Sequence, residues 1–300
     1  MPAEHPAPPA ARDPTIEVPF DQYERYRITA EIAAAFGPPG PVPRRALDVG
    51  GHFSDPAGQP RLPIREFLPR WHTVTADLVA SPLTGYVRAR GDDLPFADRS
   101  FDLVSSVDVL EHVPPDRRER LVGHLLRTSR RVVLLAAPFD APLVARAESL
   151  LAAFVERTCG YVQGQLREHR ERGLPDLGRT CRQIEAAGWS TAVFRYGNLW
   201  RWLLMMIDKH AVAALPSSHA VHRLLDARYN EQVFASDTEP PCYRHFVVAA
   251  RDGADPVLAF VRRRFAGQLV DPSGPDGDAD AAQADRLLDL AALHADNQHL

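Results

Sequence analysis

The sequence predicts an α/β fold in which helices cover both faces of an open, mostly parallel sheet. Three observations indicate it. Short apolar runs typical of buried strands alternate with amphipathic helical segments along the chain. A turn of small residues, Gly50-Gly51, directly follows the first of these runs. The carboxylates of Asp77 and Asp108 follow two others. Ligands of open parallel sheets bind outside the carboxyl ends of the strands, so these residues indicate a binding site.

The composition is that of an ordinary globular protein. The 300 residues allow one large α/β domain with additions, and 45% of them are hydrophobic. A formal charge of −4 provides no general attraction to nucleic acid or to an anionic membrane. Three scattered cysteines without a Cys-x-x-Cys pair favour a reducing, cytoplasmic setting, and the N-terminus shows no signal peptide. No apolar run reaches the ~20 residues of a spanning helix. We therefore predict neither nucleic-acid binding nor stable membrane insertion.

The sequence lacks residues that two common classes of nucleotide-binding protein require. The chain has a single lysine, Lys209, and no Gly-Lys-Ser/Thr sequence, which excludes a P-loop. A Tyr-x-x-x-Lys dehydrogenase pair would need a tyrosine where Met205 stands. The Gly-x-Gly-x-x-Gly fingerprint of NAD-binding sheets is also missing, so an NAD-dependent oxidoreductase is disfavoured.

The elements can be assigned in order. Residues 1–14 are rich in Pro and Ala, which predicts a disordered tail. A helix with a partly apolar face follows and ends at the Gly/Pro-rich stretch 37–43. Apolar runs then predict strands, and leucine-rich periodic segments predict helices. The predicted strands are 45–49, 71–78, 86–88, 101–107, 131–137, 189–196 and 246–250, and the predicted helices are 20–36, 115–127, 141–172 and 180–187.

The C-terminal half carries additional helical segments. Residues 198–207 are rich in aromatics and methionines that could line an acceptor pocket, form a dimer face or lie on a membrane surface; core or interface packing is favoured. Residues 271–280 form an acidic linker. Leu287, Leu288, Leu290 and Leu293 then predict a short amphipathic helix that could pair with a partner or a second copy, or fold back.

The stretch from Gly91 to Val113 carries the most specific motif. Its acidic loop, Leu94-Pro95-Phe96, Asp98, Ser100-Phe101-Asp102 and Glu111-His112 closely resemble class I S-adenosylmethionine-dependent methyltransferases, in particular the type 11 group. The resemblance covers about residues 20 to 140. It implies a Rossmann-like seven-stranded sheet of strand order 3-2-1-4-5-7-6 with a helical insertion after strand 5. It also implies S-adenosyl-L-methionine as cofactor.

The resemblance assigns cofactor-binding roles position by position. The family pattern after the first strand is acidic-x-Gly-x-Gly-x-Gly, and His52 stands where the next glycine is expected. Arg90 occupies the position of the acid that usually holds the adenine amino group, and one of the two carboxylates after it could take over that role. Asp77 is expected to accept hydrogen bonds from the ribose hydroxyls. The implied cofactor-binding residues are Asp48, Gly50, Gly51, Asp77, Leu78, Asp92, Asp93, Ser106 and Asp108.

The expected chemistry is in-line methyl transfer, for which a hydroxyl acceptor needs a general base. His112 is the first candidate and His169 the second, with Glu111 or Asp108 orienting an imidazole or binding the cofactor's amino group. We expect the methyltransferase domain to span residues 15–270, with insertions over 141–176 and 198–235 forming an acceptor lid. His219 and His222 lack a third ligand nearby, so no metal site is predicted.

The acceptor is expected to be a hydroxyl rather than an amine. The Asn/Asp-Pro-Pro-aromatic signature of many amino methyltransferases is missing, since Glu239-Pro-Pro-Cys242 does not match it. The chain is similar overall to methyltransferases found beside glycosyltransferases in bacterial cell-surface polysaccharide pathways, which implies a small-molecule, saccharide or glycolipid hydroxyl. The alternative is a methyltransferase-like protein that has lost turnover and binds a partner.

Overall fold

The structure is a computed structural model that describes residues 13–38, 40–55, 58–213, 218–251 and 256–273. Most of the N-terminal tail lies outside these ranges. Its last two residues are described, and Asp13 caps a short 3-10 turn, η1, over Pro14–Glu17. The predicted C-terminal amphipathic helix lies outside the described residues. So does the part of the acidic linker beyond residue 273.

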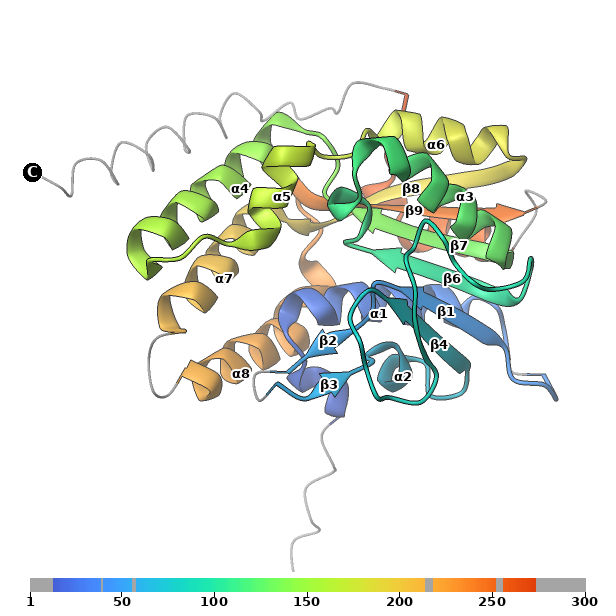
Figure 1. The fold of residues 1–300 in the computed structure, drawn as a ribbon, viewed down its shortest axis with the longest axis horizontal. Helices are drawn as coiled ribbons and strands as arrows, with labels where there is room; N and C mark the ends of the chain where they lie inside the picture. Colours follow the sequence, from blue (N-terminus) through green and yellow to red (C-terminus); the bar gives the residue numbers. More distant parts are fainter. Residues whose placement is uncertain (1–12, 39, 56–57, 214–217, 252–255, 274–300) are drawn as a thin grey trace, which may run out of the picture.

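A seven-stranded sheet forms the centre of the molecule (Figure 1). Its order is β5-β4-β1-β6-β7-β9-β8. The strands β2 and β3 form a separate two-stranded ribbon. When the seven sheet strands are numbered without them, the order is 3-2-1-4-5-7-6, which confirms the prediction. The first five strands of that order are parallel, and β9 runs antiparallel to both of its neighbours. The strands are β1 Arg45–Val49, β2 Phe53–Ser54, β3 Pro60–Arg61, β4 His72–Asp77, β5 Tyr86–Arg88, β6 Phe101–Val107, β7 Ser129–Ala137, β8 Trp189–Asn198 and β9 Cys242–Arg251.

Helices cover both faces because successive strand residues point to opposite sides. Ala46 and Val132 pack into the apolar cluster that contains the buried residues of α1, α4, α7 and α9. Their neighbours Leu47 and Val133 pack into a second cluster with α3 and α6. The helices are α1 Phe20–Ala34, α2 Ile64–Phe67, α3 Arg118–Thr128, α4 Pro142–Phe154, α5 Gly164–Arg172, α6 Leu177–Ala186, α7 Leu199–Val212, α8 Ser218–Arg228 and α9 Pro256–Arg264.

The long helical segment predicted over 141–172 is not continuous. After α4 the chain makes a π-helical turn, η4, over Val155–Cys159, and Gly160 then adopts a left-handed conformation with φ of 75° that ends it. The chain resumes as α5, where the Gln163 side chain accepts a hydrogen bond from the N–H of Leu166. The break turns α5 back, so that it packs on α4 and on the turn after β6 (Figure 1).

The closing strand is longer than predicted. The sequence indicated only residues 246–250, whereas β9 begins at Cys242 and pairs with β8 from there. Tyr243, Arg244 and His245 interrupt the apolar pattern but are buried. A π-helical turn, η5 Tyr229–Val233, and a 3-10 turn, η6 Phe234–Ser236, connect α8 with this strand. Across the described ranges, no helix combines the length and the apolar character that a bilayer crossing requires.

Candidate active site

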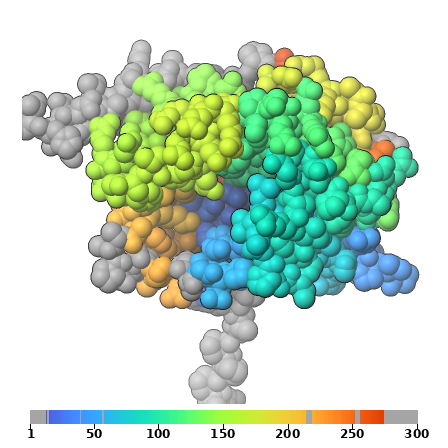
Figure 2. Space-filling view, in the orientation of Figure 1, coloured from blue at the N-terminus to red at the C-terminus, as the bar shows by residue number. Residues whose placement is uncertain are grey.

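The face of the molecule seen in Figure 2 is hollowed at its centre, and atoms of α1 form the floor of the hollow. The β2–β3 ribbon, the segment between β4 and β6, and α5 surround it. The chain turns that follow β1, β4 and β6 carry most of the predicted site residues. Parallel strands end at the same edge of their sheet, so these turns lie side by side.

The turn after β1 requires glycine at two successive positions. Gly50 has φ of 81°, and a Cβ there would lie 2.2 Å from Cγ2 of Val109. A Cβ on Gly51 would lie 1.8 Å from Oδ2 of Asp48. Both distances are far below van der Waals contact, so any side chain would displace its neighbours. The backbone alone occupies this corner, which is the arrangement that lets a turn approach a ligand closely.

Asp48 is buried beneath that turn. Its Oδ2 accepts a hydrogen bond from the hydroxyl of Tyr26 at 2.9 Å, and its Oδ1 accepts one from the hydroxyl of Ser105 at 2.8 Å. Burial raises the pKa of Asp48 to about 6, although both hydrogen bonds oppose the shift. Tyr26 lies on α1, Asp48 on β1 and Ser105 on β6, so this carboxyl joins the helix to two neighbouring strands of the parallel sheet.

Asp77 ends β4 and faces the glycine turn. Its Oδ2 accepts a hydrogen bond from the backbone N–H of His52 at 3.1 Å, and its Oδ1 accepts one from the N–H of Leu78 at 2.6 Å. His52 replaces a family glycine but contributes its backbone in the same turn, while its ring packs edge-on against Tyr86. Asp77 is half-buried and the Leu78 side chain is exposed, so the end of β4 is open to a ligand.

The loop after β5 separates the two neighbouring carboxylates. Asp92 is buried, with oxygens 3.0 Å from Nε of Arg90 and 2.6 Å from Nε of Arg117. Asp93 is exposed and pairs with Arg120 at the surface. Of the two candidates for the adenine end, only Asp92 is therefore enclosed, and two arginines already neutralise it.

Asp108 lies in a buried ion-pair network that sequence reasoning missed. Its carboxylate accepts hydrogen bonds from Nε and Nη2 of Arg244, the shortest at 2.6 Å, and Arg25 lies 2.6 Å away on the other side. Burial alone would raise the pKa of Asp108, but the two guanidinium groups outweigh it and lower that pKa. Arg244 also contacts Glu24 at 3.1 Å, and burial raises the pKa of Glu24 to about 7. The available signal was an arginine in the otherwise apolar approach to the closing strand.

The three predicted catalytic residues lie together. The 3-10 turn η2 over Leu110–His112 carries Glu111 and His112, and α5 brings His169 against it. Nε2 of His112 lies 3.4 Å from Nε2 of His169. Nδ1 of His112 lies 3.1 Å from Oε2 of Glu168. The carboxylate of Glu148, in α4, lies 2.9 Å from Nδ1 of His169 and accepts a second hydrogen bond from the hydroxyl of Tyr243.

Electrostatics favour the uncharged forms of His112 and Glu111. Burial and the neighbouring His169 lower the pKa of His112. Burial, reinforced by the charge of Asp108, raises the pKa of Glu111 well above its usual range. Oε2 of Glu111 and Oγ of Ser106 are buried and have no hydrogen-bond partner among the described residues. The cluster of Glu111, His112 and His169 therefore presents an unpaired carboxyl oxygen next to two imidazoles.

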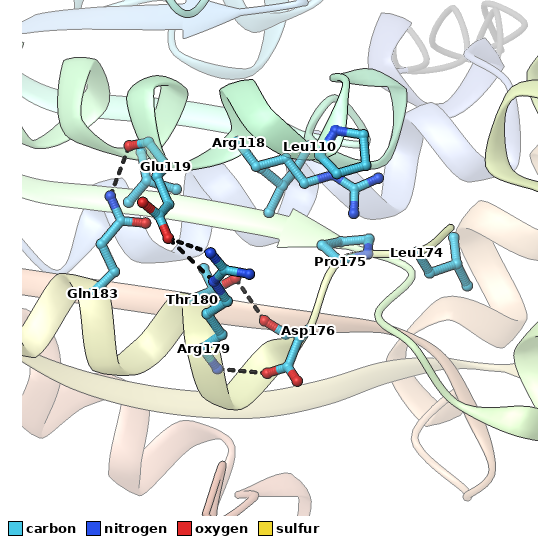
Figure 3. Close-up of a pocket in the computed structure, with 11 residues that line it drawn as sticks. Leu110, Arg118, Glu119, Leu174, Pro175, Asp176, Arg179, Thr180 and Gln183 are labelled. Carbon is cyan, nitrogen blue, oxygen red and sulfur yellow. Dashed lines mark hydrogen bonds and ion pairs between the residues drawn. The ribbon is translucent and has the colours of Figure 1, made fainter. Parts of the chain in front are cut away.

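A separate small cavity lies between α3 and α6 (Figure 3). Glu119 and Arg179 form a 2.6 Å ion pair across it, and Gln183 donates a hydrogen bond to the backbone oxygen of Glu119. None of the predicted site residues lines it. The contacts join two neighbouring helices, so we assign this cavity to helix packing.

The comparisons with known proteins agree with the motif. Residues 69–133 match the family model described as "Methyltransferase domain", of the type 11 group. No curated protein matches the chain.

Several solved structures resemble this chain in fold at low sequence identity. The YcgJ protein from Bacillus subtilis is 13% identical, with 75% of this chain and 100% of that chain covered and a TM-score of 0.41. Phosphoethanolamine N-methyltransferase 2 of Haemonchus contortus is 13% identical, with 75% and 52% covered and a TM-score of 0.43. The plantazolicin methyltransferase BpumL in complex with SAH is 12% identical, with 78% and 86% covered and a TM-score of 0.44.

The family match places β4, β5 and β6 and the turn that holds Glu111 and His112 inside a recognised sequence pattern, and the strand order of the whole sheet is the one this pattern implies. Residues 69–133 therefore resemble the methyltransferase-domain family, in agreement with the motif between Gly91 and Val113.

Proposed function

We propose that the protein transfers a methyl group from S-adenosylmethionine to a hydroxyl group of a small molecule or saccharide. The observation that carries this proposal is the contact between the glycine turn and the chain segment that leads into His112. Val109, whose methyl group a Cβ on Gly50 would strike, lies three residues before His112. The turn expected to cradle the cofactor and the turn that carries the candidate base are therefore in contact.

The residues at the turn fit an adenosyl cofactor at its ribose and methionine ends. The corner at Gly50 and Gly51 has no room for side chains. The half-buried carboxylate of Asp77 lies beside it and can accept further hydrogen bonds, as ribose hydroxyls require. The buried Ser106 hydroxyl, without a partner among the described residues, is a further donor. At the adenine end, Asp92 would act as a carboxylate that is already paired with arginine.

The bound cofactor would supply an activated methyl group on a sulfonium, so the chain itself must position the acceptor and accept its proton. His112 is suited to this because burial lowers the pKa of its imidazole, which favours the neutral form that can accept a proton. The Glu168 carboxylate accepts from Nδ1–H, which leaves the lone pair on Nε2 to take a proton. His169, held in the same way by Glu148, is the second possible base.

The acceptor would enter the hollow past the helices of the two insertions. α4 and α5 lie above the hollow, and α5 forms part of its rim (Figure 2). Together with α7 and α8, within 198–235, they form the lid that we propose for a saccharide or glycolipid hydroxyl. None of the three cysteines forms a disulfide, which supports the proposed cytoplasmic location.

Calorimetric titration with S-adenosylmethionine, S-adenosylhomocysteine and NAD tests the cofactor assignment. We expect both adenosyl ligands to bind with micromolar affinity and NAD not to bind. Incubation with hydroxylated saccharide acceptors and radiolabelled cofactor then tests turnover. Cofactor binding without turnover on any acceptor would instead support the partner-binding alternative, and failure to bind either adenosyl ligand would overturn the proposal.

A further inference from the structure

The two imidazoles of the cluster place their Nε2 atoms face to face, an arrangement that needs a proton or a cation between them. A carboxylate can only accept hydrogen bonds, so Glu168 and Glu148 each hold the proton of one histidine on Nδ1. The lone pairs of both Nε2 atoms then face each other across 3.4 Å. Two such lone pairs repel unless a cation or a shared proton lies between them.

The separation of the two nitrogens suits a metal ion. A zinc ion bound by imidazole nitrogens at ~2.0–2.1 Å in tetrahedral geometry holds two of them roughly 3.3 Å apart. A third ligand is available, because the ligand atoms of Glu111, His112 and His169 all lie within 4.8 Å of one another. Glu111 is buried, and its Oε2 has no hydrogen-bond partner in the described part of the chain. Ligand atoms of a tetrahedral zinc site lie roughly 3.3 Å apart, so the carboxylate oxygen would move by up to about 1.5 Å to bind such an ion.

The surroundings have the pattern that supports metal-binding histidines. Such histidines usually donate their second ring N–H to a carboxylate, which fixes the ring and makes the ligating nitrogen more basic. Both histidines have this partner here. Glu148 is itself fixed by the hydroxyl of Tyr243 on β9, and Glu168 lies 3.1 Å from Nη1 of Arg172.

We propose that Glu111, His112 and His169 form a binding site for one divalent transition-metal ion, with Zn²⁺ as the expected occupant. Two imidazole nitrogens and one carboxylate oxygen are a ligand set of catalytic zinc sites and of related ions such as Co²⁺ and Fe²⁺. Three protein ligands leave a coordination position open. If the proposed function holds, an acceptor hydroxyl at that position would become more acidic and would release its proton to solvent water as it takes the methyl group. The ion would then replace the imidazole as the group that activates it.

The test is metal binding by the full-length protein after treatment with a chelator. Co²⁺ is titrated and followed by its visible absorption, Zn²⁺ is titrated by calorimetry, and S-adenosylhomocysteine binding is measured on the same samples. We expect one ion per chain. Glu111→Gln and His169→Gln should weaken metal affinity at least about 100-fold, and Glu148→Gln about 10- to 100-fold. The matched controls are His222→Gln on α8 and Glu156→Gln, an exposed glutamate in the turn after α4. Both should leave metal affinity unchanged.

The parallel titrations separate the two proposals. Protein that binds S-adenosylhomocysteine but no metal would overturn the metal site, and the two histidines would then share a proton. Metal binding that the three variants leave unchanged would also overturn it, since the ion would lie elsewhere, for example at a cysteine. Stoichiometric metal binding that these variants weaken, in protein that does not bind S-adenosylhomocysteine, would support the site while overturning the proposed function.

Discussion

Replacing Asp48 by Asn should stabilise the protein at neutral pH and have a smaller effect in mild acid. The carboxyl has a pKa of about 6 in the folded protein against an ordinary value of 3.8. The folded state therefore binds the proton more tightly than the unfolded state does. As pH rises from about 4 to about 6, the folded protein must ionise a buried group, and stability falls. At about 1.4 kcal/mol per pKa unit, the full loss is about 3 kcal/mol.

An asparagine keeps most of the contacts of Asp48 without ionising. Its oxygen can accept the hydrogen bond from Ser105, whereas its NH₂ group must face the Tyr26 hydroxyl, and a weakened bond there costs about 1 kcal/mol. The net expectation above pH 7 is a variant more stable than the natural chain by about 2 kcal/mol. Urea unfolding at pH 5 and at pH 7.5 measures this, with Asp98→Asn as the control for the same change at the surface.

The reasoning concerns the difference between the two pH values. Between pH 5 and pH 7.5 the advantage of Asp48→Asn should grow by about 1.4 kcal/mol. An equal destabilisation at both values would refute it, because the carboxylate would then stabilise the fold through its hydrogen bonds alone. The expected result would mean that the fold tolerates an unfavourable charge beneath the glycine turn, as binding sites often do.

Three further changes have definite expectations. Asp77→Asn should weaken S-adenosylhomocysteine binding about 10- to 100-fold in calorimetry, since a neutral amide accepts weaker hydrogen bonds from ribose; an unchanged affinity would remove Asp77 from the site. Gly51→Ala places a Cβ 1.8 Å from a carboxylate oxygen, so it should abolish that binding and lower stability by about 1–3 kcal/mol in urea unfolding. Phe194→Ala removes a ring stacked on Phe246 and Phe265, 5.1 and 3.9 Å away, and should cost about 3–5 kcal/mol in the same assay while the folded variant still binds ligand; a loss under 1 kcal/mol would contradict the packing argument.

The strands were predictable because their apolar runs depend on burial alone. β1, β5 and β6 begin and end where the sequence indicated. The limits of helices were predicted less accurately where a cap or a break decides them. α6 begins at Leu177, before the predicted residue 180, because Asp176 caps it. The break at Gly160 lies inside a continuous helical sequence pattern. The sequence could bring Glu111 and His112 together, since they are neighbours.

The contact of His112 with His169 could be suspected only from the expected position of the insertion. Local patterns could single out Arg244 as an arginine beside an apolar strand, but they could not identify its partners. It lies on β9, and its partners Asp108 and Glu24 are 136 and 220 residues away along the chain. A buried ion pair is fixed by tertiary contacts, and periodicity does not report on its partners.

The network around Arg244 has a consequence for how the protein is made. β9 is inserted between β7 and β8, and its Arg244 pairs with Glu24 in α1 and, together with Arg25, with Asp108 after β6. During synthesis these two acids emerge long before the arginine, and long-range contacts of this kind form slowly. A nascent or truncated chain ending before residue 242 would contain every predicted cofactor residue, yet Glu24 would lack its arginine partner and Asp108 would keep only Arg25. Ligand binding should therefore appear only after the last strand has joined the sheet, which makes it a sensitive report of complete folding.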